Sequence, residues 1–311
     1  MRSTSNMVTI QGYVFSHHLF ERVTGPTTKN PGQPFINGSI DIAIDEAATQ
    51  TVHVQFSYVT PTYKNGNENL TYSLLKKIID TNDVYERVGN HAIKVRLDAN
   101  FGTNVYKNRT GDIVVSTRID GAFMHELEPA AKFGTIPAKF SVDMVITNTA
   151  EREFANGSTL FELHGYVFNY RQSLVPITFT VDGEEGQRYF ESQDYPMFTN
   201  LWGNIESETI VSQRELTASA FGNPQVETTE RQVMRWNVKG SANEPYEYDD
   251  PTGITKEEMK EKLAEHEAYI AQQTARLNGA GTAAPAAYSE PKKKAAAAPK
   301  KAPAAIDEFD F

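Results

Sequence analysis

The sequence predicts a mainly β protein with one or two small five-stranded barrels, followed by an amphipathic helix and a disordered C-terminal tail. Two stretches, 7–130 and 136–250, alternate apolar and polar residues and are rich in aromatic and β-branched side chains. After residue 250 the composition changes to a helical pattern and then to a tract of Ala, Pro and Lys. We therefore expect two β domains over these stretches and a separate C-terminal extension.

The first domain has five strand-like segments with one helical interruption. In the helical segment, Leu74, Leu75 and Ile78 fall on one face. The predicted strands cover 8–15, 39–44, 51–59, 92–99 and 112–123, and the helix covers 70–80. Three strands, a helix and two strands follow one another as in the five-stranded oligonucleotide-binding barrel, the OB-fold, so we expect an OB-like domain.

The second domain repeats strand-like segments with turn signals between them. They cover 140–147, 159–170, 175–181 and 231–239, and a helix or loop is expected over 187–202. The tetrapeptide Gly-Tyr-Val-Phe occurs at 12–15 and again at 165–168. Because it would occupy different strands in the two domains, it is weak support for a duplication.

A helical pattern covers 254–278. Thr255 and Glu258 have the spacing of a capping box, and Gly279 marks the end. One apolar stripe consists of Met259, Leu263, Ile270 and Leu277. This narrow stripe fits docking on the preceding barrel or self-association, and the number of heptads does not decide between them.

The Ala/Pro/Lys tract over 279–305 predicts a disordered, extended tether. The tether ends in an acidic segment that carries two aromatic rings. Its residues are Ile306, Asp307, Glu308, Phe309, Asp310 and Phe311. Because charges steer an encounter and rings anchor it, we expect 306–311 to be a tail that recruits a partner with a basic groove and an apolar pocket. A frayed acidic end is the alternative.

Composition excludes several classes of function. The chain has no cysteine, which excludes disulfides and thiolate metal sites, and no sequence motif for nucleotide cradling, nucleophilic catalysis or zinc hydrolysis is present. We therefore expect no enzyme activity, no cofactor and no metal site. We also expect a chain that is neither membrane-bound nor exported, since it has no long apolar run and no signal segment. The net charge of −10 requires that any anion-binding surface be a local basic strip.

Aromatic and cationic residues alternate on several predicted strands and loops. Single-stranded nucleic acid needs such pairs, because bases stack on rings while Lys and Arg follow the phosphates. Alternation also puts about half of the rings in a core, so Tyr13 and Phe15 fit either position, and Trp202 is expected inside. The candidate DNA-binding residues are Tyr58, Tyr63, Lys64, Lys94, Arg96, Tyr106, Lys107, Arg109, Arg118, Tyr170, Arg171, Arg235 and Trp236.

An OB-like body, a connector helix, a low-complexity tether and the ending Asp-Glu-Phe-Asp-Phe resemble the single-stranded-DNA-binding proteins of bacteria and phages. The resemblance implies sequence-tolerant binding that protects and organises single-stranded DNA during replication, recombination and repair. It also implies that the tail recruits replication and recombination proteins. The tail ends in Asp-Phe where the bacterial form has Pro-Phe. This and the second barrel suggest a phage-encoded version acting in the bacterial cytoplasm, with homo-oligomerisation left open.

Two other functions remain open at this point. An all-β viral structural or assembly protein could use the same tail to dock a partner. A nucleic-acid enzyme on an OB scaffold would need turnover that depends on a divalent metal.

Overall fold

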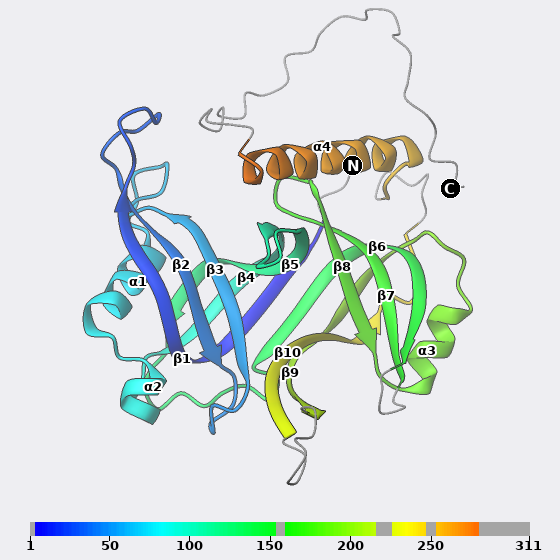
Figure 1. Cartoon of the computed structure of the whole chain (residues 1–311), viewed down its shortest axis with the longest axis horizontal. Helices are drawn as coiled ribbons and strands as arrows, with labels where there is room; N and C mark the ends of the chain where they lie inside the picture. Colours follow the sequence, from blue (N-terminus) through cyan, green and yellow to red (C-terminus); the bar gives the residue numbers. More distant parts are fainter. Residues whose placement is uncertain (1–3, 154–158, 216–225, 247–252, 280–311) are drawn as a thin grey trace, which may run out of the picture.

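The computed structural model describes residues 4–153, 159–215, 226–246 and 253–279, with the strands over 208–215 and 226–232 described by their backbone alone. Ten strands form one continuous sheet that is bent into two barrels standing side by side (Figure 1). The predicted fold class, a mainly β chain with five-stranded barrels and a helix after them, is therefore confirmed. The tether beyond 279 and the tail over 306–311 lie outside the described residues.

The first barrel closes in the order β1, β2, β3, β5, β4 and back to β1. Only the β3–β5 contact is parallel, and α1 (Leu70–Thr81) lies between β3 and β4 in the chain. The strands are β1 (Asn6–Val23), β2 (Pro34–Ala43), β3 (Thr51–Val59), β4 (Lys94–Lys107) and β5 (Ile113–Glu126). This closure and helix position are those of an OB barrel.

The helices of the first barrel pack against its strands. In α1, Leu74, Leu75 and Ile78 are buried as the spacing predicts, and the side chain of Asn69 caps the first turn. Two short helices follow, α2 (Tyr85–Val88) and a 3₁₀ turn (Gly89–His91).

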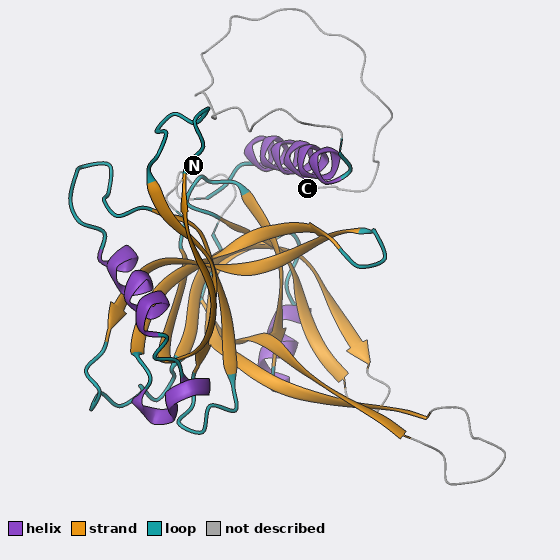
Figure 2. Ribbon diagram, turned by 60° about the vertical axis from the view of Figure 1, so that its left-hand side comes forward, coloured by secondary structure: helices purple, strands orange, loops and turns teal. Residues whose placement is uncertain are grey.

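The second barrel has the same strand order, β6, β7, β8, β10, β9 and back to β6, with α3 before its fourth strand. Its elements are β6 (Ala138–Glu153), β7 (Thr159–Phe168), β8 (Leu174–Val181), α3 (Glu184–Glu191), β9 (Met197–Glu215) and β10 (Val226–Ser241). The expectation of a helix or loop over 187–202 was partly wrong, because β9 begins at Met197. Beyond the barrel, β9 and β10 continue as a two-stranded ribbon (Figure 2).

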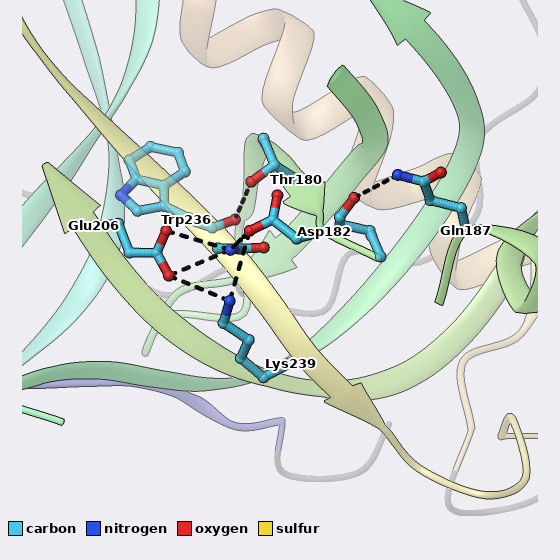
Figure 3. Close-up of polar contacts among 8 residues, drawn as sticks. Thr180, Asp182, Gln187, Glu206, Trp236 and Lys239 are labelled. Carbon is cyan, nitrogen blue, oxygen red and sulfur yellow. Dashed lines mark hydrogen bonds and ion pairs between the residues drawn. The ribbon is translucent and has the colours of Figure 1, made fainter. Parts of the chain in front are cut away.

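Side chains reinforce the short parallel contact that closes this barrel. The β8–β10 register consists of Asn237 opposite Thr180 and Val238 opposite Val181. Lys239 Nζ lies 3.6 Å from Asp182 Oδ2 and 3.3 Å from Glu206 Oε1, and Asn237 Nδ2 donates to both carboxylates (Figure 3). The two carboxylates and Lys239 are therefore committed to barrel closure.

The two barrels are joined by antiparallel pairing of β1 with β6, from Asn6 opposite Val142 to Ile10 opposite Ala138. The buried Asn6 amide donates to the carbonyls of Phe101 and Phe168, and its oxygen accepts from Phe101 N–H at 2.9 Å. Because this one buried side chain forms hydrogen bonds with the backbone of both barrels, it fixes how the two barrels are aligned. One hydrophobic core runs through both barrels as a result.

The C-terminal helix α4 (Lys256–Leu277) begins with the predicted capping box of Thr255 and Glu258. Its first turns dock on the second barrel, where Met259 and the preceding Ile254 are buried with Phe168. From there α4 crosses above the sheet towards the first barrel (Figure 1). Of the predicted stripe, Met259 and Leu263 therefore dock on the barrel, whereas Leu277 is exposed.

No helix in the described part of the chain is long and apolar enough to span a membrane.

Candidate nucleic-acid interface

A group of exposed rings lies on the outside of the first barrel, at the end where β1 leads into the loop over 24–33. Alternation puts Leu19 and Ile36 inside, so Phe20 and Phe35 face outward. The Phe35 ring centroid lies 4.7 Å from that of Tyr58 on β3. These rings form an exposed platform, since Phe20 and Tyr58 are each about half exposed.

A cation accompanies these rings. The guanidinium of Arg22 lies 5.5 Å from the centroid of Phe20, two residues earlier on the same face of β1. Arg22 has no acidic partner among the described residues. A cation held beside exposed rings by a weak contact can still reach a phosphate.

The platform continues onto β5. Gln55 of β3 lies opposite Asp120 of β5, and three residues further along each strand come Tyr58 and Phe123. Phe123 is 52% exposed, and its ring lies 6.5 Å from that of Tyr63 in the loop after β3. Exposed rings therefore lie on β1, β3 and β5 and in the loop after β3, and the half-buried Phe35 lies on β2 against Tyr58.

The loop that holds Tyr63 also exposes Lys64. The Tyr63 N–H donates to Asn67 O at 2.8 Å, and Gly66 takes a positive φ of 84° that closes the turn. Lys64 is exposed and has no acidic partner in the described part of the chain. Polar neighbours keep this ring and cation in water, as the sequence suggested.

The hairpin between β4 and β5 presents a second ring with cations. Tyr106 is 41% exposed, and Lys107 and Arg109 are exposed. Asn108 Oδ1 accepts from Asp112 N–H and from the Thr110 hydroxyl, which fixes the turn that carries Arg109. Hydrogen bonds from Thr110 and Asn108 also hold the pKa of Asp112 below its usual value.

The turn between β7 and β8 repeats this chemistry on the second barrel. Tyr170 is 75% exposed, and the Arg171 guanidinium lies 5.1 Å from its ring centroid. Asn169 Oδ1 accepts from the N–H groups of Arg171 and Ser173, which orders the turn. Tyr170 and Arg171 are thus a preformed exposed pair.

A cleft of about 370 Å³ separates the start of β5 from the outer face of the second barrel. The Thr117 hydroxyl donates to Pro176 O at 2.7 Å and holds the two walls together. The cleft is lined by Val115, Ser116, Thr117, Thr147, His164, Gly165, Tyr166, Pro176, Ile177, Thr178 and Trp236. Its lining of hydroxyls, imidazole and aromatic groups suits a flat polar ring.

Helix α4 contacts one wall of the cleft. The imidazole of His266 lies 6.2 Å from the Tyr166 ring, edge to face. Burial lowers the pKa of His266. The pKa of Tyr166 is raised, mainly by burial and to a smaller extent by the nearby carboxylate of Glu267. Both groups are therefore uncharged at neutral pH beside the cleft.

Four of the predicted binding residues make other contacts. Lys94 Nζ donates to Pro129 O and Ala131 O at 2.7 and 2.9 Å, so it is held by backbone carbonyls. Arg118 is half-buried and pairs with Asp120 at 2.7 Å. These two cations are not available to a phosphate, and we leave both out of the interface.

Trp236 and Arg96 are the other two. The Trp236 ring centroid lies 5.0 Å from that of Phe101, where Trp236 packs against the core, and Trp236 also lines the cleft. Arg96 is exposed on β4, lies 3.9 Å from Asp98 and lines a second pocket beside Lys139. Arg235 is half-buried on β10. The candidate interface therefore keeps the loop and hairpin residues and loses most of the strand residues.

Sequence reasoning missed Phe35 and Phe123, and it placed Trp202 inside, where the structure finds it 45% exposed. Strict alternation around the buried Ile36 and Met124 was the signal for the first two. No group of three or more His, Asp or Glu side chains in the described residues is placed to hold a metal ion.

Comparison with known proteins gives a fold likeness and a family. Two solved structures, the wild-type single-stranded DNA binding protein from Thermus aquaticus and a deletion mutant of it, each have 11% identity and a TM-score of 0.45. Each comparison covers 80% of this chain and 97% of the other, and at this TM-score the likeness carries no argument about function. No curated protein matches the chain. The model of the YorF family matches residues 5–275, so the chain belongs to the YorF family.

Proposed function

We propose that this protein binds single-stranded DNA without strong sequence preference and protects it during replication, recombination and repair. The observation that carries the proposal is the set of exposed rings accompanied by cations that have no acidic partner among the described residues. The set consists of Phe20, Arg22, Tyr58, Tyr63, Lys64, Tyr106, Lys107, Arg109, Phe123, Tyr170 and Arg171; together with the half-buried Phe35 beside Tyr58, we call it the binding surface.

Rings and cations are the two chemistries that a flexible strand needs. Stacking on a ring stabilises each bound base by roughly 1–3 kcal/mol and tolerates any base. Cations neutralise phosphates and make affinity depend on salt. Several exposed cations elsewhere on the body are engaged with acids, for example Lys77 with Glu126 and Arg188 with Glu184. An acidic chain that leaves the cations beside its exposed rings unneutralised has a local site for a polyanion.

We also propose that the tail over 306–311 recruits partner proteins and takes no part in DNA binding. The support is its sequence, two phenylalanines among three acids, which DNA phosphates would repel. When the binding surface is vacant, the tail is expected to compete for it, and bound DNA is expected to displace the tail. We propose that the protein acts in the cytoplasm, which is that of the bacterial host if the chain is phage-encoded.

The test of the tail is a variant that ends at residue 305. Its affinity for oligo-dT should equal or exceed that of the full chain, because an internal competitor is gone. Pull-down of host replication and recombination proteins should be lost. DNA affinity that falls on truncation would contradict the division of labour between body and tail.

An assembly protein remains the second candidate, and the β9–β10 ribbon that leaves the barrel (Figure 2) is the observation that favours it. Projecting ribbons can add to the edge of a neighbouring sheet. Sedimentation velocity of the chain without DNA separates the two candidates. Large closed assemblies support the assembly role, and a single small species supports the DNA-binding role.

A further inference from the structure

A second exposed face lies across the junction of the two barrels, on the strands β4, β1, β6 and β9. Residues that lie opposite one another in antiparallel strands point to the same side. The register puts Thr9 opposite both Asp98 and Lys139, and Ser141 opposite Trp202. We call this the junction face, and its outward residues are Met7, Thr9, Gln11, Arg96, Asp98, Lys139, Ser141, Trp202 and Asn204.

Trp202 is the most prominent ring on this face. It lies opposite Gly240 of β10, and a Cβ placed on Gly240 would lie 2.6 Å from the indole carbons. The indole therefore rests on the glycine backbone, which only a residue without a side chain permits. With 45% of its surface exposed, Trp202 offers an open side for stacking.

A pocket with cationic walls lies on the same face. Its volume is about 340 Å³, and Arg96 of β4 and Lys139 of β6 contribute to its walls together with Gln11 and the segment 134–137. Lys139 is exposed and has no acidic partner among the described residues, while Arg96 is 3.9 Å from Asp98. Lys139 and Trp202 are diagonal neighbours on paired strands, on the order of 7–8 Å apart.

The junction face is continuous with the binding surface. Phe123 on β5 lies opposite Asp98 on β4, and the same row continues through Thr9 on β1 to Lys139 on β6. A single strand of DNA that passes the Phe123 ring could therefore follow this row of paired residues across β4 and β1 to Lys139 on β6. Asp98 is the one acid in this row, and the Thr9 hydroxyl and Arg96 both contact it.

We propose that a long single strand of DNA continues from the binding surface onto the junction face, where Trp202 stacks a base and Lys139 with Arg96 contacts phosphates. This inference rests on the proposed function and extends it to a wrapped path. The occupant is a polyanion with flat rings, because an open indole and an unneutralised lysine stand next to each other. A second copy of the chain is the other occupant that such a face could take.

The experiment compares two lengths of oligo-dT, about 10 and about 40 nucleotides, the first within and the second beyond the roughly 4–16 nucleotides that one OB barrel covers. Lys139→Ala and Trp202→Ala are compared with the wild type. Lys77→Ala on α1 serves as the matched control, since Lys77 is exposed and bonded to Glu126. For the long strand, Trp202→Ala should bind about tenfold more weakly. Lys139→Ala should reduce the salt slope by about 0.7. For the short strand, both variants and the control should match the wild type.

Fluorescence gives a second readout. The chain has two tryptophans, so Trp236→Phe leaves Trp202 as the sole emitter. The long strand should quench this emission, and the short strand should leave it unchanged. Variants that bind both lengths like the wild type, with Trp202 unquenched, overturn the wrapped path and leave the proposed function intact.

Two further outcomes are distinct. If the wild type binds neither length at low salt, the proposed function itself fails. If the chain without DNA is a dimer that Trp202→Asp dissociates, the junction face is an interface between copies, and the wrapped path is overturned.

Discussion

The Nζ of Lys107 donates to the side-chain oxygen of Asn278 at 3.4 Å. Lys107 ends β4 of the first barrel, and Asn278 follows the helix whose first turns are docked on the second barrel through Met259. The contact therefore links the hairpin of one barrel to the helix of the other. The contact is exposed, and the Asn278 side chain carries no charge. Lys107 can therefore leave Asn278 and bind a phosphate instead.

The hairpin cations should contribute salt-dependent affinity. Replacing Lys107 and Arg109 by Ala should weaken binding to all oligonucleotide sequences alike and reduce the slope of log affinity against log salt by about 1.4, at about 0.7 per phosphate contact on a single strand. Titration of oligo-dT and oligo-dA at several salt concentrations measures this. Arg188→Ala, which breaks only an α3 pair with Glu184, should leave the slope unchanged. A double variant with the wild-type slope removes the hairpin from the interface.

The rings should contribute affinity that salt does not change. Replacing Phe35 or Tyr58 by Ala should weaken oligo-dT binding by roughly 1–3 kcal/mol, because each ring stacks a base. The salt slope should stay the same. Tyr269→Ala, on the exposed side of α4, is the ring control. Equal affinities for all three variants would show that the platform on β2 and β3 is not used.

Lys94 should matter for stability alone. Its ammonium binds two carbonyls and lies 5.1 Å from the Tyr13 ring, so Lys94→Met should lower the free energy of unfolding by about 2 kcal/mol. Urea unfolding measures this loss. DNA affinity measured well below the melting temperature should be unchanged, and a selective loss of affinity would return Lys94 to the interface.

The pair of His53 and Asp41 should make stability depend on pH. The hydrogen bond to Asp41 raises the pKa of His53 above 6.5. Burial alone would raise the pKa of Asp41, but the hydrogen bonds from His53 and Ser16 outweigh burial, so the pKa of Asp41 lies below its usual value. A raised histidine pKa stabilises the fold fully below pH 6.5, and this stability is lost as pH rises through the folded-state pKa. His53→Gln should therefore cost about 0.5 kcal/mol at pH 5.5 and less at pH 9, since the pair is partly exposed. A cost independent of pH would contradict this.

The terminal ring should act on partners and not on DNA. Phe311→Ala should reduce partner affinity by on the order of 2 kcal/mol if the ring fills a pocket. Calorimetry with a captured partner measures this, and oligo-dT binding is the internal control. Wild-type partner affinity for the variant would remove the anchor role of Phe311.

The two-barrel architecture could be predicted because alternation and turn residues are local signals. The start of strand β9 was not predicted, and the reason is also local. Its inward position Gly203 faces Phe140 and the backbone of Asn237, where a Cβ would collide, while its outward neighbour is Trp202. Hydrophobicity is therefore inverted at this point of the strand, so the pattern predicted neither the strand nor an exposed Trp202.

The candidate site could be predicted only in its loops. Tyr63, Lys64 and the hairpin residues have polar neighbours in sequence, which fixes their exposure. Lys94 could not be assigned, because the segment containing Pro129 and Ala131 folds over it from 35 or more residues away. Trp236 likewise meets Phe101 only when the two barrels pack together. Partners distant in sequence decide which cations and rings remain open.

Titration of fluorescent oligo-dT across salt is the measurement that tests the central claim most directly. Tight binding at low salt that weakens linearly in log affinity against log salt, with equal behaviour for mixed sequences, is the predicted result. No binding at low salt, with the chain folded by circular dichroism, would contradict the assignment of this fold to single-stranded DNA.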